Sequence, residues 1–231
     1  MTPKGYAATE LTSRLAKARK IEAMLGGDVA GLDLLDLGAG SGLLADYFAS
    51  RGARVTAADR DVSAYRSEMP VVRIEGAKLP FADESFDVVI FNHVIEHVGK
   101  ETEQRAILAE IGRLLRPAGK LYLAAPNKWA IIEPHFRLPL LGALPRGLAN
   151  RMVRLFRGDP EYDCYPLTRS RLTALMRSCF PAVHDKSSDA VAWVIKNELG
   201  GFPQRLLAAV PSLLYRLAWP AYPTFILVGG K

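Results

Sequence analysis

The chain has 231 residues, of which 49% are hydrophobic and 23% charged. This length and composition predict one well-buried domain and exclude an intrinsically disordered protein. The net charge of +6 is unevenly placed: residues 1–128 carry 17 basic and 17 acidic residues, whereas residues 129–231 carry 13 and 7. A basic half is typical of proteins that meet nucleic acid, an anionic membrane surface or an anionic substrate, and a solvated basic face explains it equally well.

Cysteine content and hydropathy narrow the compartment. Cys164 and Cys179 are too few for a disulfide framework, fit a reducing cytoplasm, and do not by themselves make a zinc site. The N-terminus lacks a signal-peptide pattern, and no stretch reaches the roughly 18–20 apolar residues of a membrane span. We therefore expect a cytoplasmic protein, with peripheral contact to the inner face of a membrane left open.

Strand-like and helix-like segments alternate through the first 128 residues. Apolar periodicity and turn residues predict, in chain order, a helix over 11–25, a strand over 32–37, a helix over 42–50, strands over 54–58, 70–74 and 86–91, a helix over 101–115 ended by Pro117-Ala118-Gly119, and a strand over 120–125. Alternation with short connections predicts an α/β fold, a doubly wound and mostly parallel sheet covered by helices on both faces.

The pattern changes after Pro126. Residues 127–168 are rich in proline, aromatic residues and arginine and show no clear strand. Later segments predict a helix over 169–180 with Thr168 as its N-cap, a strand over 182–186, helical structure over 199–222 and a last strand over 224–229. The late strands bring the sheet to seven. We expect a single domain over 1–231, with a core over 30–127 and insertions over 128–168 and 199–222.

A glycine loop, Asp36-Leu-Gly-Ala-Gly-Ser-Gly42, follows the first strand and opens a helix. Glycines let a ligand approach the backbone, and a helix N-terminus offers free N–H groups. The spacing G-x-G-x-G is neither the G-x-G-x-x-G of dinucleotide sites nor a P-loop. Asp59 ends the second strand, where a carboxylate can accept hydrogen bonds from ribose hydroxyls; taken alone, it would more readily be a cap for a helix near Val62.

A third segment, GAKLPFADESFD at Gly76–Asp87, indicates which kind of cofactor the glycine loop and Asp59 bind. With it, the chain resembles the class I S-adenosylmethionine-dependent methyltransferases (methyltransferase domains 11 and 25). The strings LLDLGAGSG, AADRD, GAKLPFADESFDVVI, EHV and RLLRPAGKLYLAAPN stand in the order and spacing of that family, over about residues 30–127. The resemblance implies a Rossmann-like fold, S-adenosylmethionine as cofactor, and methyl transfer. For the acceptor we expect a small or lipid-linked molecule, with oxygen as the default methylated atom.

The resemblance also implies which residues hold the cofactor. The loop would pass under the methionine part, the end of the second strand would bind the ribose, the next residues would border the adenine, and the end of the fourth strand would approach the methyl group. These residues are Asp36, Gly38, Ala39, Gly40, Asp59, Arg60, Ala77, Lys78 and Asn92. Gly76 departs from the family, since many relatives have Asp there, so a backbone carbonyl or Glu75 would have to replace the adenine contact.

Catalytic candidates follow the fourth and fifth strands. Methyl transfer from a sulfonium needs alignment first, and a base only where the acceptor must lose a proton. His93, at a strand end, either meets the acceptor or is simply hydrogen-bonded there. Glu133 and His135, in the stretch EPHFR, either position a polar acceptor, which we favour, or anchor a turn.

Glu96 and His97 are further candidates after the fourth strand. The pair recurs in the family and either takes part in the chemistry or shapes the loop into the next helix, and for His97 we favour the loop-shaping role. His93, Glu96 and His97 share this loop without a second acidic ligand, so we expect no metal site.

The basic excess is densest over 137–157, where arginines alternate with leucines. Arg151 and Arg154 can share the polar face of a helix whose other face is apolar, which is typical of a helix lying on a membrane surface. A helix packed on the sheet with its arginines in water is the alternative. Together with the apolar stretch 202–222, the segment suggests a lid that admits a hydrophobic or lipid-linked acceptor from an anionic membrane.

Other functions remain open at this point. A nucleic-acid methyltransferase is disfavoured, because the arginines stand among bulky aliphatic residues rather than stacking aromatics. A non-catalytic cofactor-binding regulator would keep the same motifs. The glycine spacing disfavours an NAD dehydrogenase, and nothing in the sequence fixes the oligomeric state.

Overall fold

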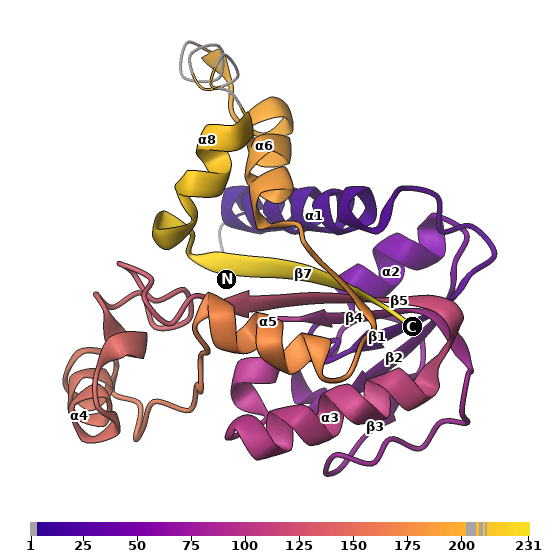
Figure 1. The fold of residues 1–231 in the computed structure, drawn as a ribbon, viewed down its shortest axis with the longest axis horizontal. Coiled ribbons are helices and arrows are strands. Elements are labelled where there is room, and N and C mark those ends of the chain that lie inside the picture. The colour runs from indigo at the N-terminus through magenta and orange to yellow at the C-terminus, as the bar shows by residue number, and fades with distance from the viewer. Residues whose placement is uncertain (1–3, 202–206, 208–209, 211) are drawn as a thin grey trace.

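A seven-stranded sheet forms the centre of the computed structural model, which describes residues 4–201, 207, 210 and 212–231 (Figure 1). The sheet order is β3-β2-β1-β4-β5-β7-β6, and β7 runs antiparallel to both its neighbours while the other pairs are parallel. The strands are β1 Asp33–Leu37, β2 Arg54–Asp59, β3 Val71–Arg73, β4 Phe86–Asn92, β5 Leu115–Pro126, β6 Ala182–Asp185 and β7 Thr224–Gly230. This confirms the predicted fold class.

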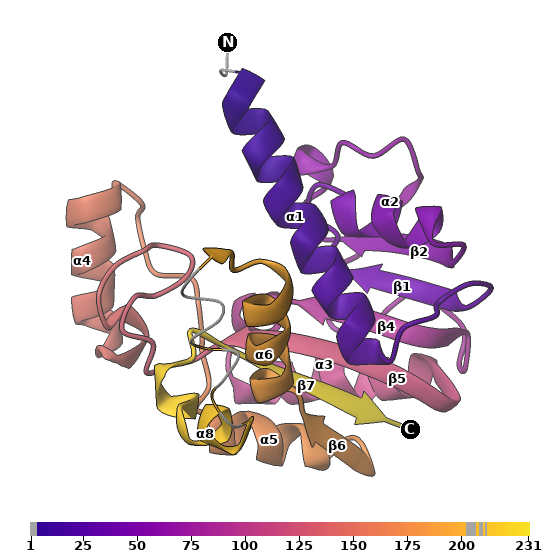
Figure 2. The ribbon, with the colours of Figure 1, turned by 90° about the horizontal axis from the view of Figure 1, so that it is seen from above.

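Helices cover both faces of the sheet (Figures 1 and 2). One face carries α1 Lys4–Leu25, α2 Leu43–Ser50 and α6 Ser187–Asn197; the other carries α3 Glu101–Leu114 and α5 Arg169–Arg177. Helix α4, Arg146–Arg157, lies beyond the end of the sheet, and α8 is Ser212–Leu217. Short 3-10 turns occupy Val62–Ala64, Ile95–His97, Leu141–Ala143 and Trp219–Ala221. Within the described ranges, no helix is long and apolar enough to cross a membrane.

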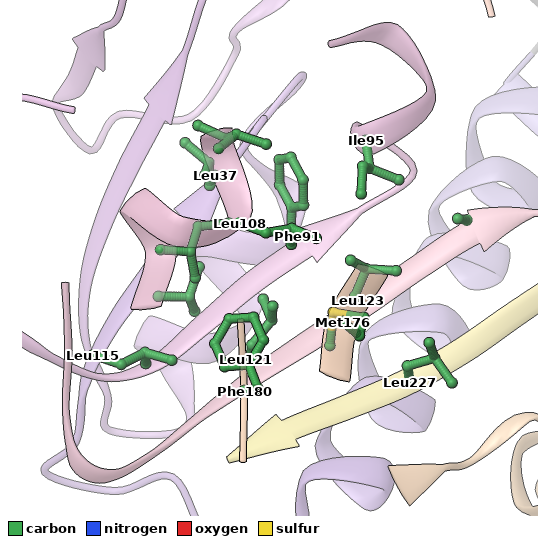
Figure 3. Close-up of a cluster of buried hydrophobic side chains, with 14 of the residues drawn as sticks. Leu37, Phe91, Ile95, Leu108, Leu115, Leu121, Leu123, Met176, Phe180 and Leu227 are labelled. Atoms are coloured by element: carbon green, nitrogen blue, oxygen red, sulfur yellow. The ribbon is translucent and has the colours of Figure 1, made fainter. Parts of the chain in front are cut away.

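The larger core lies between the sheet and helices α3 and α5. Strands β1, β4 and β5 contribute near-continuous apolar runs because both of their faces are covered. Figure 3 shows side chains from these strands, from β7, from the turn after β4, from α3 and from the α5 region packed together: Leu37, Phe91, Ile95, Leu108, Leu115, Leu121, Leu123, Met176, Phe180 and Leu227. Each fully buried side chain of this size contributes about 1.5–3 kcal/mol relative to exposure. This packing fixes the strand ends that carry the site.

Most predicted elements are present within a few residues of their expected bounds. Thr168 is the N-cap of α5, since its hydroxyl accepts a hydrogen bond from the Arg171 N–H at 3.4 Å. The predicted start of the fifth strand at 120 is wrong: β5 begins at Leu115, directly after α3. The ladder with β4 is interrupted there and resumes at Lys120, because Ala118 takes a positive φ of 64° and returns the chain to the sheet.

Two late segments need separate mention. Helix α6 has no counterpart among the predicted elements, although it packs on the sheet through Ala190 and Ile195. Part of the helical stretch expected over 199–222 falls on residues 202–206, 208–209 and 211, which lie outside the described residues.

Candidate functional site

The glycine loop joins β1 to α2 at the carboxyl end of the sheet. Its glycines differ in what surrounds them. A Cβ at Gly38 would lie 2.3 Å from the Val94 side chain, and one at Gly42 would lie 2.6 Å from Ser67. A Cβ at Gly40 would meet no atom within 4 Å, although φ is +54° there as well. Packing therefore requires glycine at the two outer positions, whereas the middle one leaves open space directly over the backbone.

Asp36 lies beneath this loop and is almost fully buried. Its Oδ2 atom has no hydrogen-bond partner among the described residues. Burial, followed by the negative charge of Asp59, raises the pKa of Asp36 to about 7, against the lowering effect of the Ala45 N–H. The loop is thus underlain by a carboxyl group with one free oxygen, which suits a cationic or hydrogen-bond-donating ligand group.

Asp59 ends β2 and faces the loop. Its Oδ2 accepts from the Gly40 N–H at 2.7 Å and its Oδ1 from the Asp61 N–H at 3.0 Å. The cap of the turn at Val62–Ala64 is Asp61, whose side chain accepts from the Ser63 N–H. The alternative that Asp59 caps this segment is therefore wrong, and Asp59 instead joins the glycine loop to the rim of a cleft.

This cleft has a volume of about 510 Å³. It brings together five of the predicted site residues, which come from four segments of the chain: Gly38, Asp59, Arg60, Ala77 and His93. Gly76 also lines the cleft at a φ of +69°, with open space where a Cβ would stand. Lys78 is exposed and is not among the lining residues, so the structure does not bring it to the cleft.

Arg113 on α3 holds the segment that follows Ala77. Its guanidinium donates to the carbonyl oxygens of Leu79 and Phe81 at 3.2 and 2.9 Å and pairs with Glu110 at 2.6 Å. Glu110 in turn accepts from the Leu79 N–H. The segment 79–81 is therefore fixed to α3 by charge-assisted hydrogen bonds. The sequence does not indicate this role of Arg113.

A second cavity, of about 280 Å³, lies between α1, α6 and strands β4, β5 and β7. Asn92 lines this cavity and is absent from the lining of the larger cleft. His93 lines both, and its backbone is held at a φ of +58°, in the left-handed region. Burial lowers the pKa of Lys20 at the edge of this cavity, against the opposing charge of Glu198. His93 thus stands between two cavities at the end of β4.

Three of the four histidines gather around Glu96. The Glu96 Oε1 atom lies 2.9 Å from His135 Nε2 and 3.4 Å from His93 Nδ1, and the carboxylate is fully buried. Burial raises the pKa of Glu96, but the facing imidazoles of His135 and His93 outweigh it and bring the pKa to about 2. Burial lowers the pKa of His135, and its hydrogen bond to Glu96 leaves it above the ordinary value. Glu96 is therefore a buried carboxylate that faces two histidines at the end of β4.

His97 borders the same cluster on its exposed side. Its Nδ1 lies 3.1 Å from Asp163, and its ring packs edge-on against His135 with centroids 4.9 Å apart. The buried Cys164 thiol lies 3.9 Å from both ring nitrogens. The stretch 163–164 was not singled out from the sequence, because nothing local distinguishes it.

Glu133 has the anchoring role that was left as the alternative. It is buried, and its Oε2 accepts from the N–H groups of His135 and Phe136 at 2.9 and 2.6 Å. Its backbone also closes the turn, accepting from the Arg137 N–H and donating to Leu138. Glu133 therefore presents His135 to the cluster, and contact with an acceptor stays a prediction for His135.

The insertion over 128–168 exposes an unusual amount of apolar surface. On α4 the helix buries Ala149 and Val153, yet Leu148, Leu155 and Phe156 are 52%, 77% and 61% exposed. Trp129, Ile131, Ile132 and Leu140 are also about half exposed or more. Arg151 and Arg154 are exposed on the same helix. The predicted helix is confirmed, with its apolar face largely turned to solvent.

Comparison with known families and curated proteins matches the central part of the chain. Residues 35–123 match the family model described as "Methyltransferase domain". A demethylmenaquinone methyltransferase of Corynebacterium urealyticum is 35% identical over 95 residues, which are 39% of this chain and 40% of that protein. A ubiquinone biosynthesis O-methyltransferase of Xanthomonas oryzae pv. oryzae is 35% identical over 137 residues, 52% of this chain and 55% of that protein. The chain thus spans about half the length of these relatives.

Solved structures extend the likeness in fold to nearly the whole chain. An S-adenosylmethionine-dependent methyltransferase from Mesorhizobium loti superposes with a TM-score of 0.61 at 18% identity, covering 94% of this chain and 98% of that one. One from Archaeoglobus fulgidus gives a TM-score of 0.60 at 14% identity, covering 94% of each chain. At this identity the likeness establishes the fold alone.

Proposed function

We propose, from the premise that residues 35–123 belong to the class I S-adenosylmethionine-dependent methyltransferase family, that this protein transfers a methyl group from S-adenosylmethionine to a small-molecule acceptor. The observation that carries the proposal is the pairing of an open glycine loop at Gly40 with the Asp59 carboxylate on the rim of a 510 Å³ cleft.

The residues present fit the cofactor. The free Oδ2 of Asp36 under the loop suits its ammonium group, and the open space over Gly40 leaves room for its methionine part. Asp59 would bind the ribose, while Arg60 and Ala77 would border the adenine. When bound, the cofactor supplies a methyl group already activated on a sulfonium, so the chain has mainly to position the acceptor. With no Asp at position 76, a backbone carbonyl in the segment around Gly76 would meet the adenine.

We place the methyl acceptor in the second cavity, beside His93. Because His93 lines both cavities, an acceptor in the second cavity would approach the cleft across its imidazole. His135 has a raised pKa and lies beside the Glu96 carboxylate, which His93 also faces. Its imidazole is therefore suited to hold a proton delivered from the acceptor side. A hydroxyl acceptor loses its proton on methylation, so an oxygen acceptor would use such a group.

We further propose a hydrophobic or lipid-linked acceptor that is met at an anionic membrane surface. Leu148, Leu155 and Phe156 are exposed on a helix that also exposes Arg151 and Arg154, a combination that favours the interface of a bilayer. The two relatives are named for demethylmenaquinone and for ubiquinone biosynthesis, and such quinones are apolar. The ranges 128–168 and 199–222 would then be the acceptor-side part of a single domain.

Cofactor binding is tested by titrating the protein with S-adenosylhomocysteine in a calorimeter. We expect wild type to bind and Asp59→Asn to bind about tenfold or more weakly, because a charged hydrogen bond contributes about 1.5–3 kcal/mol. Glu161→Gln removes an exposed carboxylate that does not line the cleft and should bind as wild type does. Absence of binding by the wild-type protein would refute the proposed function.

The membrane step has its own test. Wild type should sediment with vesicles of phosphatidylglycerol and phosphatidylcholine, and Arg151→Glu/Arg154→Glu should not, with salt weakening the wild-type binding. As a matched control, Arg19→Glu/Arg105→Glu reverses two exposed arginines elsewhere on the chain. Equal sedimentation of all three proteins, or none by wild type, rules out this surface and leaves the methyl transfer proposal standing.

A further inference from the structure

The cluster around Glu96 has a feature that methyl transfer alone does not require. Three nitrogen or oxygen atoms that can ligate a metal, one each from His93, Glu96 and His135, all lie within 4.8 Å of one another. They come from two segments, the loop after β4 and the turn held by Glu133. We propose that His93, Glu96 and His135 form a binding site for a divalent transition-metal ion of the Zn²⁺ class.

The buried carboxylate is the first argument. Glu96 is 1% exposed, and its Oε2 has no hydrogen-bond partner among the described residues. The buried His93 Nδ1 lies 3.4 Å from the other carboxylate oxygen, Oε1, and makes no hydrogen bond among the described residues either. Buried polar atoms without a hydrogen bond are costly, so two of them in one cluster of potential ligands indicate that a bound group completes the set. A cation held between them would satisfy both atoms at once.

The distances agree with this interpretation. Zinc–nitrogen and zinc–oxygen bonds of about 2.0–2.2 Å in a tetrahedral site place ligand atoms roughly 3.3–3.5 Å apart. His93 Nδ1 and Glu96 Oε1 are 3.4 Å apart, and His135 Nε2 and Glu96 Oε1 are 2.9 Å apart. If His135 Nε2 and Glu96 Oε1 moved about half an ångström farther apart, a metal ion could bind both atoms and replace the hydrogen bond between them.

The three ligands indicate which kind of metal ion the site would bind. Two imidazoles and one carboxylate suit Zn²⁺, Fe²⁺ or Co²⁺, whereas Mg²⁺ and Ca²⁺ prefer oxygen ligands throughout. Three protein ligands also leave a coordination position open. Because His93 lines both cavities, that position can be reached by an oxygen of a bound small molecule.

A second set of atoms, from His97, His135 and Cys164, also lies within 4.8 Å. It shares His135 with the first set, so the two compete for that residue. The first set is favoured because its central ligand is the buried carboxylate with a free oxygen, while the His97 Nδ1 already contacts Asp163 at 3.1 Å. The sequence indicates no metal, because the loop with His93, Glu96 and His97 lacks a second acidic ligand, and His135 stands far along the chain from this loop.

Calorimetric titration of the metal-stripped full chain with ZnCl₂ tests the proposal without any assay of activity. We expect one Zn²⁺ per chain for wild type and for His184→Gln, which removes the exposed fourth histidine on β6. Glu96→Gln and His135→Gln should each weaken binding about 100-fold or more. Cobalt substitution should give visible absorption bands that the same two variants lose, and thermal unfolding of each variant shows whether it is folded.

Cys164→Ser separates the two sets. We expect it to bind Zn²⁺ as wild type does. Loss of Zn²⁺ binding in Cys164→Ser with retention in Glu96→Gln would transfer the site to the second set and overturn the proposal. No Zn²⁺ binding by wild type, or equal binding by folded Glu96→Gln, His135→Gln and wild type, would overturn it as well. These results do not depend on cofactor binding, so failure here leaves the proposed function untouched.

Discussion

The aspartates at the two ends of β1 have pKa values that are shifted in opposite directions. At the start of β1, Asp33 pairs with Arg54 and Arg116 at 2.7 Å each, and these hydrogen bonds hold its pKa at about 2. Three residues later, Asp36 is buried without a cation, and burial raises its pKa to about 7. The difference in pKa arises within one strand, so it comes from what the tertiary structure places at each end of the sheet.

The contrast extends across the sheet. At the amino end, Arg116 joins Asp33 to Asp87 at the start of β4, so the acidic groups there have cationic partners. At the carboxyl end, Asp36 and Glu96 each keep a buried oxygen without a hydrogen-bond partner. A protein tolerates unsatisfied buried groups mainly where a ligand will complete them. The amino end therefore stabilises the fold, while the carboxyl end is arranged for binding.

The largest expected effect concerns stability at the carboxyl end, through the pH dependence of Asp36. Its folded-state pKa lies above the ordinary 3.8, so the unfolded chain gives up its proton first as pH rises. The free energy of unfolding should therefore fall between about pH 4 and pH 7, by about 4 kcal/mol at most, and level off above pH 7. Urea denaturation at several pH values measures this.

Asp36→Asn should flatten that part of the profile, and Asp33→Asn supplies the opposite case. The pKa of Asp33 is lowered to about 2, so its contribution to stability is complete above pH 3.8 and disappears as pH falls through 2. The Asp33 variant should thus differ from wild type at neutral pH and converge with it in acid. Parallel profiles for wild type and both variants would contradict the comparison.

A second prediction compares Gly38 in the glycine loop with Gly31, which precedes β1. Gly38→Ala should lower the free energy of unfolding by about 2–4 kcal/mol, because its Cβ overlaps the Val94 side chain in addition to the strain of a positive φ. Gly31→Ala has a similar φ of +73° with open space around it and should lose only about 1–2 kcal/mol. Equal losses in urea denaturation would show that packing at Gly38 does not matter.

Gly40→Ala should weaken ligand binding strongly while it lowers the free energy of unfolding less than Gly38→Ala does. Because its Cβ meets no protein atom, the variant should remain close to Gly31→Ala in stability. S-adenosylhomocysteine titration should nevertheless weaken about tenfold or more, since the new methyl group occupies space left for the ligand. Unchanged affinity would argue against binding over this part of the loop.

The smallest effect is expected at the amino end. Arg116→Gln removes the hydrogen bonds to Asp33 and Asp87, which are partly exposed and screened by solvent. The urea midpoint should fall by a few tenths of a molar at most, and less at high salt. S-adenosylhomocysteine affinity should not change, and a tenfold loss would show that the two ends of the sheet are coupled.

The sequence by itself determined the sheet, most of its strands and the glycine loop, because apolar periodicity and the positive-φ requirement of glycine act over a few neighbouring residues. It also indicated Asp59, whose place at the end of β2 follows from the strand. It missed α6 and set the start of β5 late, where the tight turn at Ala118 lies within the strand.

Only the tertiary structure decided which polar groups meet. His135 and Cys164 reach the loop after β4 through long connections, and Asn92 faces the second cavity although it adjoins His93. Glu133, expected near the acceptor, binds the N–H groups of its own turn. A carboxylate's pKa depends on burial and on charges brought from elsewhere in the chain, which is why Asp33 and Asp36 look alike in sequence and differ in the folded protein.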